Sequence, residues 1–276
     1  MKLLAAFIFT LYCTQAQASN YYPTNSKEKI NKLENQALRD ELFKILVKKH
    51  ISLGASKDDK LVENCGDQRK GRCYGHRTLS YNAARKILFG VIHLEEDSSG
   101  HYIKDVYCQK KFTSVETRLG PNIIPDHSKI NCEHTWPQSK FNPLFSKGQQ
   151  KTDLHHLYPA DSKANSVRGN YEFSFVDGKA QRGCESSYLG RQQKGRNTFF
   201  EPPNSHKGNV ARSIFYFAVR YKMPISDIQE DALRQWHEQD PIDEEEMERN
   251  ETIHLVQGNR NPFIDFPEIV DQINDF

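Results

Sequence analysis

After its first dozen residues the chain has no long hydrophobic run, no paired Cys-x-x-Cys spacing and no strong excess of either charge. A membrane-spanning helix needs about 20 apolar residues, so no later segment is expected to cross a bilayer. Without paired Cys-x-x-Cys motifs, a structural zinc site is not expected. A formal net charge of +2 does not match the strongly basic balance of an architectural nucleic-acid binder. The chain also has no internal repeat and no long low-complexity linker.

The N-terminus has the pattern of an export signal. Lys2 precedes a short apolar run that ends near Tyr12, and Ala16-Gln17-Ala18 supplies the small residues of a cleavage site. The alternatives are a membrane anchor or a buried helix, but the run is too short to cross a bilayer. We expect a signal peptide over residues 1–18, Ser19 as the first mature residue, and a secreted or periplasmic protein.

Export leaves an odd number of cysteines, because Cys13 would be removed with the signal. Five remain, namely Cys65, Cys73, Cys108, Cys132 and Cys184. An oxidising compartment permits disulfides, and at least one thiol must then stay unpaired or pair between chains. The sequence does not determine the connectivity, although Cys65 and Cys73 are close enough to close a small loop.

The rest of the chain has the composition of a globular protein, with 37% hydrophobic and 27% charged residues in 276. Helical spacing of apolar residues predicts helices over 26–50 and 81–89, and a short helix over 161–170. Strands are expected over 101–112 and from Ile123 towards Cys132. Residues 54–75 and 181–198 are polar and contain glycine, and we interpret them as loops.

Three further helices are predicted at the C-terminal end. The first runs from Ala211 to Tyr221, and the second begins at a capping box formed by Ser226 and Gln229. The third begins in the acidic run 243–248. Acidic residues are favoured at a helix N-terminus, so this run predicts a helix start rather than a metal site. Few strands among many helices predict an α+β fold, with a single domain over 19–276 and an N-terminal helical part at about 19–75.

The residues with the clearest chemistry lie in three blocks within forty residues. The blocks are Asn131-Cys132-Glu133-His134-Thr135-Trp136-Pro137-Gln138-Ser139, Asp153-Leu154-His155-His156-Leu157-Tyr158-Pro159-Ala160-Asp161, and Asn165-Ser166-Val167-Arg168-Gly169-Asn170. Hydrolysis of a phosphodiester needs a base to activate water, and histidine titrates closest to neutrality. It also benefits from a hard cation, which prefers a few oxygen ligands and keeps several waters. One carboxylate and one amide meet that need.

The local backbone limits how these groups can meet. In an extended strand the side chains of Glu133 and His134 point to opposite faces. Bringing both to one centre predicts a bulge or bend where the strand ends, and Pro137 favours such an end. The amide of Asn165 would approach from the short helix.

These ordered blocks resemble the endonuclease I family, which are bacterial periplasmic or secreted nucleases of the ββα-metal (His-Me finger) superfamily. Further similar segments extend the resemblance from Tyr21 to Pro262: Tyr21-Tyr22, Leu79-Ser80-Tyr81, Glu201-Pro202-Pro203, Ala211-Arg212 and Val256-Gln257-Gly258-Asn259-Arg260-Asn261-Pro262. The resemblance implies a ββα-metal core at about 100–175, surrounded by helices. It implies hydrolysis of DNA, and often of RNA, without sequence specificity and with 5′-phosphate products.

The resemblance also assigns roles to three residues. His134 matches the general base, while Glu133 and Asn165 match the two protein ligands of one divalent metal. The metal expected is Mg²⁺, or another divalent cation such as Mn²⁺ or Ca²⁺. The expected partner is nucleic acid, with no membrane contact, and we expect a monomer.

Other residues are candidates for substrate contacts. Some family members carry a cysteine-rich insertion, with a phosphate-contacting arginine, between the first two blocks. In this chain the interval is short, and its only cations are Lys140, Lys147 and Lys151. Arg168 could contact phosphate or act as a buried brace, and Trp136 fits the core better than a stacking platform. The candidate substrate-binding residues are Arg168, His155, Lys151, Arg191 and Arg196, the last two in a basic loop with aromatic neighbours.

Two other functions fit part of the pattern. A zinc hydrolase could use His134, His155 and His156 as ligands, although the chain lacks the His-Glu-x-x-His motif of common metalloproteases. A catalytically silent nucleic-acid-binding module would need no base, carboxylate and amide together. We therefore favour the nuclease.

Overall fold

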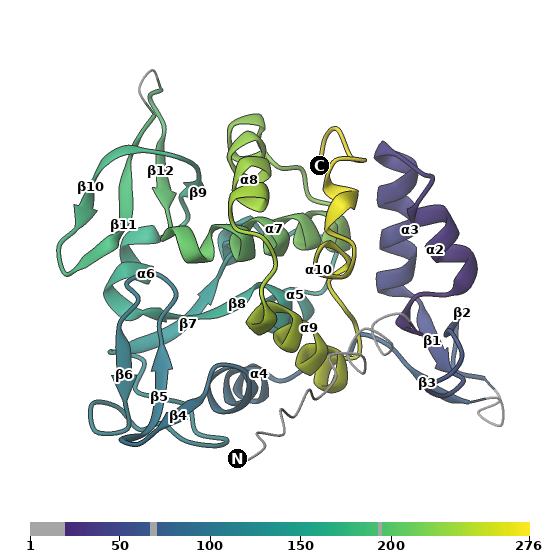
Figure 1. Cartoon of the computed structure of the whole chain (residues 1–276), viewed down its shortest axis with the longest axis horizontal. Helices are drawn as coiled ribbons and strands as arrows, with labels where there is room; N and C mark the ends of the chain where they lie inside the picture. The colour runs from purple at the N-terminus through teal and green to yellow at the C-terminus, as the bar shows by residue number, and fades with distance from the viewer. Residues whose placement is uncertain (1–19, 67–70, 193–194) are drawn as a thin grey trace, which may run out of the picture.

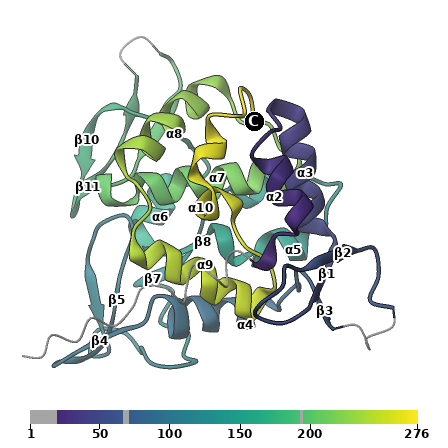
Figure 2. The same ribbon diagram turned by 45° about the vertical axis from the view of Figure 1, so that its right-hand side comes forward.

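Helix α7 (Lys207–Tyr221) is the central element of the fold. Nearly all of its side chains are buried, which is typical of a helix surrounded by other elements. It packs against α3 (Asn35–Val47) and α8 (Asp227–Gln239), and neighbouring elements surround it in both views (Figures 1 and 2). Gly208 is required where α7 passes α8, because a Cβ there would collide with the Asp240 carbonyl oxygen and the Arg212 guanidinium.

The computed structural model describes residues 20–66, 71–192 and 195–276. Helices and small sheets are mixed along these residues, which confirms the predicted α+β class. The predicted signal peptide lies outside the described residues. Across the described ranges, every helix is too short or too polar to cross a membrane.

The N-terminal part differs from the prediction in two ways. The single helix expected over 26–50 is two helices, α2 (Thr24–Ile30) and α3, and a strand begins at Lys49. The segment expected to be a loop contributes β2 (Lys60–Val62) and β3 (Arg72–Tyr74), which flank β1 (Lys49–Ser52) in an antiparallel sheet. These strands are only three residues long, so no alternation in their sequence reveals them.

The segment after this sheet largely follows the prediction. Helix α4 (Tyr81–Ile87) begins at Ser80, whose hydroxyl accepts a hydrogen bond from the main-chain NH of Ala83, and a π-helical turn (Leu88–Ile92) follows it. The strand expected over 101–112 is a hairpin of β5 (Gly100–Lys104) and β6 (Lys111–Thr113), with β4 (Glu95–Asp97) at its edge.

The second predicted loop is also wrong. Residues 184–191 form β11 (Cys184–Arg191), the longest strand of a sheet with the order β10-β11-β12-β9. The other strands are β9 (Glu172–Phe173), β10 (Asp177–Gln181) and β12 (Thr198–Glu201). A polar, glycine-bearing strand such as β11 is fixed by pairing on both sides, and its own sequence does not report those partners.

The C-terminal helices confirm the acidic helix start and contradict the capping box. Asp243 caps α9 (Glu244–Gln257) by accepting a hydrogen bond from the main-chain NH of Glu246. At the start of α8 the Ser226 hydroxyl instead donates to Glu172, and Gln229 accepts from the main-chain NH of Phe173. Both side chains bond to neighbouring segments, so the tertiary structure overrides the local motif. The chain closes with α10 (Pro262–Asp265) and a 3-10 turn (Pro267–Val270).

The cysteines pair as the export prediction allows. Within the described residues Cys65 bonds to Cys73 and Cys108 bonds to Cys184, so the short loop suggested by the sequence is present. Cys132 is the odd thiol. Burial and the adjacent Glu133 raise the pKa of Cys132 to about 12, which keeps this thiol protonated and poorly reactive.

Candidate active site

The predicted catalytic residues lie on a ββα unit. Strand β7 (Ile130–His134) pairs antiparallel with β8 (Leu157–Asp161), and α6 (Ser162–Arg168) follows β8 at once. Asp161 ends the strand and caps the helix, accepting hydrogen bonds from the main-chain NH groups of Lys163 and Ala164 at 3.0 Å. This cap fixes the position at which α6 leaves the hairpin.

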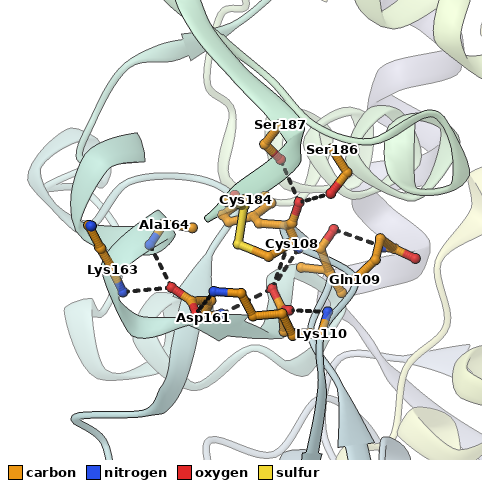
Figure 3. The surroundings of a disulfide bond; sticks show 12 residues. Cys108, Gln109, Lys110, Asp161, Lys163, Ala164, Cys184, Ser186 and Ser187 are labelled. Carbon is orange, nitrogen blue, oxygen red and sulfur yellow. Dashed lines mark hydrogen bonds and ion pairs between the residues drawn. A yellow bond between two sulfur atoms is a disulfide. The ribbon is translucent and has the colours of Figure 1, made fainter. Parts of the chain in front are cut away.

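The turn between β5 and β6 contacts the junction between β8 and α6. The carboxylate of Asp105 is fully buried and accepts hydrogen bonds from main-chain NH groups of its own turn and from that of Asp161. Lys110 adds an ion pair to Asp161 at 2.7 Å (Figure 3). The turn is thereby joined to the start of α6.

The disulfide between Cys108 and Cys184 connects this turn to β11 (Figure 3). Beside it, the hydroxyls of Ser186 and Ser187 donate to the main-chain carbonyl of Tyr107 at 2.9 and 2.7 Å. The backbone of Tyr107 is therefore held from two sides, and its side chain projects into the candidate site.

Glu133 lies in the centre of this arrangement and is 2% exposed. Its Oε1 accepts hydrogen bonds from the hydroxyl of Tyr107 at 2.8 Å and from the guanidinium of Arg168 at 2.7 Å. Burial raises the pKa of Glu133, although Arg168 and Tyr107 oppose that effect. Both of these side-chain donors bind Oε1, and within the described residues no other side chain donates to Oε2.

Asn165 projects from the face of α6 that covers β7. Its amide nitrogen donates to Oδ1 of Asn131 at 2.7 Å, and the amide of Asn131 donates in turn to Ser162 at 3.2 Å. Asn131 and Glu133 are two residues apart on β7 and therefore share one face of the strand. In the described part of the chain no hydrogen bond reaches Oδ1 of Asn165, which leaves an amide oxygen available on the same side as Glu133.

His134 ends β7 and is 6% exposed. Its Nε2 lies 3.1 Å from the carbonyl oxygen of Lys151, which can only accept, so Nε2 carries the proton. Nδ1 is then the unprotonated nitrogen, and it faces the exposed amide of Gln138 at 3.4 Å. Burial and the nearby ring of His156 lower the pKa of His134 to about 3, so the ring is neutral and able to accept a proton.

The strand geometry does not turn Glu133 and His134 to one face. The register of β7 against β8 is regular through His134, so the predicted bulge is absent from this described strand pair. Glu133 bonds on the α6 side, whereas His134 bonds to α5 (Lys147–Thr152) on the other. The chain bends only after the strand, at Pro137. The structure thus brings Glu133 and Asn165 to one side of β7 and places His134 at its end, facing away from them.

The oxygen atoms of Glu133 and Asn165 fit a hard divalent cation. A carboxylate oxygen and an amide oxygen without side-chain hydrogen-bond donors lie on one face of β7, and hard cations select such oxygen ligands. Arg168 competes with a cation for the charge of Glu133 through Oε1. Oε2 is the atom that remains for a metal.

The three histidines of the zinc alternative do not converge. His155 is buried with its Nε2 facing the carbonyl oxygen of Asn259, while Nε2 of His156 faces the carbonyl oxygen of Gln150. Only His156 packs against His134, with ring centroids 5.4 Å apart. In residues 20–66, 71–192 and 195–276, no three His, Cys, Asp or Glu side chains are grouped as metal ligands. This arrangement contradicts the zinc-hydrolase alternative.

Arg168 and Trp136 are both buried, and the contacts described for them are to other parts of the protein. Arg168 is 2% exposed, and besides Glu133 its guanidinium donates to the carbonyl oxygens of His134 and Thr135 at 2.9 and 2.5 Å. It therefore braces the end of β7. Trp136 is buried, stacks on Phe217 with centroids 5.2 Å apart, and donates its indole NH to the carbonyl of Lys140.

The remaining cationic candidates lie at different distances from the site. Lys151 is adjacent to it, because its carbonyl bonds to His134. Arg191 and Arg196 are exposed at the far end of the β11–β12 hairpin, roughly 20 Å along β11 from the Cys184 disulfide. That end of the hairpin extends away from α6 in both views (Figures 1 and 2).

Two further residues shape the site: Tyr107, which the sequence pattern missed, and Asp153, which lies in the second sequence block. Tyr107 holds Glu133 but precedes it by 26 residues, so no local motif marks it. Asp153 is fully buried and accepts hydrogen bonds from Tyr216, Tyr221 and Gln257, which ties the segment after α5 to α7 and α9. Burial alone would raise the pKa of Asp153, but its histidine neighbours and the Gln257 hydrogen bond outweigh burial and lower it.

Known proteins are similar in sequence to this chain over most of its length. The family model for endonuclease I matches residues 72–268. An extracellular ribonuclease of Bacillus subtilis (strain 168) is 38% identical over 217 residues, which cover 72% of this chain and 70% of that protein. The extracellular ribonuclease of Bacillus amyloliquefaciens is 37% identical over the same shares of both chains.

Proteins named as deoxyribonucleases are also similar in sequence to this chain. A periplasmic deoxyribonuclease of Aeromonas hydrophila is 34% identical over 156 residues, which cover 50% of this chain and 64% of that protein. The match to the family model includes the whole ββα unit and its supporting turn. The chain therefore belongs to the endonuclease I family and is a nuclease.

Proposed function

We propose that the protein is an exported endonuclease that hydrolyses DNA and RNA without sequence specificity and leaves 5′-phosphate ends. His134 acts as general base, while Glu133 and Asn165 hold one divalent cation. The observation that carries this proposal is the protonation of His134: the Lys151 carbonyl holds the proton on Nε2 and leaves Nδ1 unprotonated, with the exposed Gln138 amide at 3.4 Å. Export is supported by the N-terminal sequence and by the extracellular and periplasmic relatives.

In the proposed mechanism His134 removes a proton from the attacking water at Nδ1. The Lys151 carbonyl then stabilises the protonated ring through Nε2. Oε2 of Glu133 and Oδ1 of Asn165 would hold Mg²⁺, Mn²⁺ or Ca²⁺, which supplies charge neutralisation to the phosphate and to the leaving 3′ oxygen. His134 faces away from these oxygens. The scissile phosphate would therefore lie across the end of β7, with the Glu133 and Asn165 oxygens on one side and the His134 ring on the other.

The other candidate residues take two kinds of role. Lys151 contacts the substrate near the scissile bond, and Arg191 and Arg196 contact more distant phosphates along the strand. Contacts to phosphate carry no base information, which agrees with cleavage at any sequence. Arg168 and His155 support the site from the interior.

The proposal is tested by incubating the mature protein, from Ser19 onwards, with supercoiled plasmid and with total RNA. Each substrate is incubated once with Mg²⁺ and once with EDTA, and the products are treated with phosphatase before end-labelling. We expect degradation only with metal, and 5′ ends that accept label only after phosphatase. Intact substrates under every metal condition would contradict the proposal, and cleavage in EDTA would contradict the metal-dependent mechanism.

Replacing Asn165 with alanine should raise the Mg²⁺ concentration needed for half-maximal cleavage by at least about tenfold, because one of two protein ligands is lost. The measurement is the initial rate of plasmid cleavage over a Mg²⁺ titration. Asn170→Ala, an exposed asparagine just beyond α6, is the matched control and should follow the wild-type curve. A wild-type titration for Asn165→Ala would remove this residue from the metal site.

A further inference from the structure

Helix α4 brings an aromatic ring and a cation to the end of β7. The ring of Tyr81 lies 6.1 Å from that of His134, measured between centroids. The ammonium of Lys151 lies over the Tyr81 ring at 4.2 Å from its centroid, and the guanidinium carbon of Arg85 lies over the same ring at 4.7 Å. Two cations from separate helices therefore share one aromatic ring beside the proposed general base.

These two cations lack acidic neighbours. Among the residues that the structure describes, neither Lys151 nor Arg85 is in an ion pair with a carboxylate, and the hydrogen bond that Arg85 makes is to the neutral amide of Asn82. A cation–π contact stabilises each cation by only about 0.5–2 kcal/mol, so neither positive charge is neutralised by it. An anion placed beside Tyr81 would supply the missing negative charge.

We propose that Arg85, Lys151 and Tyr81 form a binding site for a phosphate of the substrate backbone, beside the scissile phosphate. This site rests on the proposed nuclease function and adds Arg85 and Tyr81 to it. Arg85 and Lys151 donate to non-bridging phosphate oxygens, which is a geometry that guanidinium and ammonium groups favour. Tyr81 is a positioning residue, because its ring keeps both cations at the end of β7.

The location explains why the interval between the first two sequence blocks can be short. Its other cations are not available in the same way: Lys140 forms an ion pair with Glu172 at 2.9 Å, and Lys147 lies exposed at the start of α5. Arg85 comes from a helix about fifty residues before His134 in the sequence, and folding places it over the ring that Lys151 also contacts. A cation from α4 thus joins Lys151, the one cation of the interval that contacts Tyr81.

The test is binding of a short fluorescein-labelled single-stranded DNA in EDTA, where cleavage does not interfere, at increasing KCl. Arg85→Ala and Lys151→Met should each weaken binding about tenfold at low salt. Each should also reduce the slope of log K against log salt by about 0.7, the value for one lost phosphate contact on a single strand. Lys86→Ala, the exposed neighbour on α4, is the control and should match wild type.

Three more variants separate phosphate binding from a merely structural role. Arg85→Lys keeps the charge and should keep the salt slope, and Tyr81→Phe keeps the ring and should do the same. Tyr81→Leu should reduce the slope, and in Mg²⁺ it should raise KM more than it lowers kcat.

Wild-type affinity and slope in both Arg85→Ala and Lys151→Met would overturn this site while leaving the nuclease proposal intact. Failure of the wild-type protein to cleave any nucleic acid is a separate result, because the binding assay does not depend on cleavage.

Discussion

Replacing His134 with alanine is expected to lower kcat for plasmid cleavage by about 10²- to 10⁴-fold, the range for loss of a general base. The reason is the fixed protonation of this ring. The Lys151 carbonyl holds the proton on Nε2, and burial keeps the pKa well below its ordinary value, so Nδ1 is free at neutral pH. The adjacent His156 does not replace it, because that ring is fully buried and packs against Phe141 and Phe217.

The same variant should bind DNA about as well as wild type, since His134 acts on water rather than on the nucleic acid. Single-turnover cleavage and binding in EDTA measure the two properties separately. His127→Ala replaces an exposed histidine a few residues before β7 and should leave both unchanged. Near wild-type turnover in His134→Ala would end its assignment as the base.

Replacing Arg168 with methionine should lower the free energy of unfolding by about 3–5 kcal/mol, because it leaves the Glu133 carboxylate buried without its cation. The carbonyl oxygens of His134 and Thr135 would lose their guanidinium donor in the same step. Urea denaturation in EDTA measures this change without a contribution from metal. Lys163→Met, an exposed change on the same helix, should stay within about 0.5 kcal/mol of wild type.

A double variant tests the cause of that loss. Glu133→Gln together with Arg168→Met removes both charges, so much of the stability lost in Arg168→Met should return. If Arg168 contacted substrate phosphate instead, Arg168→Met would unfold like wild type and bind DNA with a reduced salt slope. The two roles that the sequence allows for Arg168, a buried brace and a phosphate contact, therefore predict opposite results.

The sequence predicted β7 and α6 because their determinants are local, but the strand expected from Ile123 begins only at Ile130. Strand β7 ends near Pro137, and α6 starts at a capping aspartate and carries Asn165 and Arg168 one turn apart. These elements depend on residues within a few positions of each other, so strand, turn and capping preferences suffice to find them.

Prediction failed where long-range pairing decides the structure. Strand β11 is polar and glycine-bearing, and it is a strand because β10 and β12 flank it. Ser226 and Gln229 have the spacing of a capping box but bond to Glu172 and Phe173. In both cases a partner far away in the sequence outweighs the local preference.

The residues that surround the site from other elements could not be predicted for the same reason. Tyr107 reaches Glu133 from the turn after β5, and Tyr81 and Arg85 reach the end of β7 from α4. A tyrosine or an arginine in a helix or turn carries no signal of such a role until the chain is folded. The regular register of β7 also corrects the expectation of a bulge, because Glu133 and His134 serve opposite sides of one strand end.

The central claim, that Glu133 and Asn165 hold one divalent metal while His134 does not, is tested most directly by Mn²⁺ binding. Electron paramagnetic resonance of free Mn²⁺, titrated against protein without nucleic acid, gives the number and affinity of sites. We predict one site in wild type and in His134→Ala, and its loss or marked weakening in both Glu133→Gln and Asn165→Ala. Equal Mn²⁺ affinity in all four proteins would contradict this account.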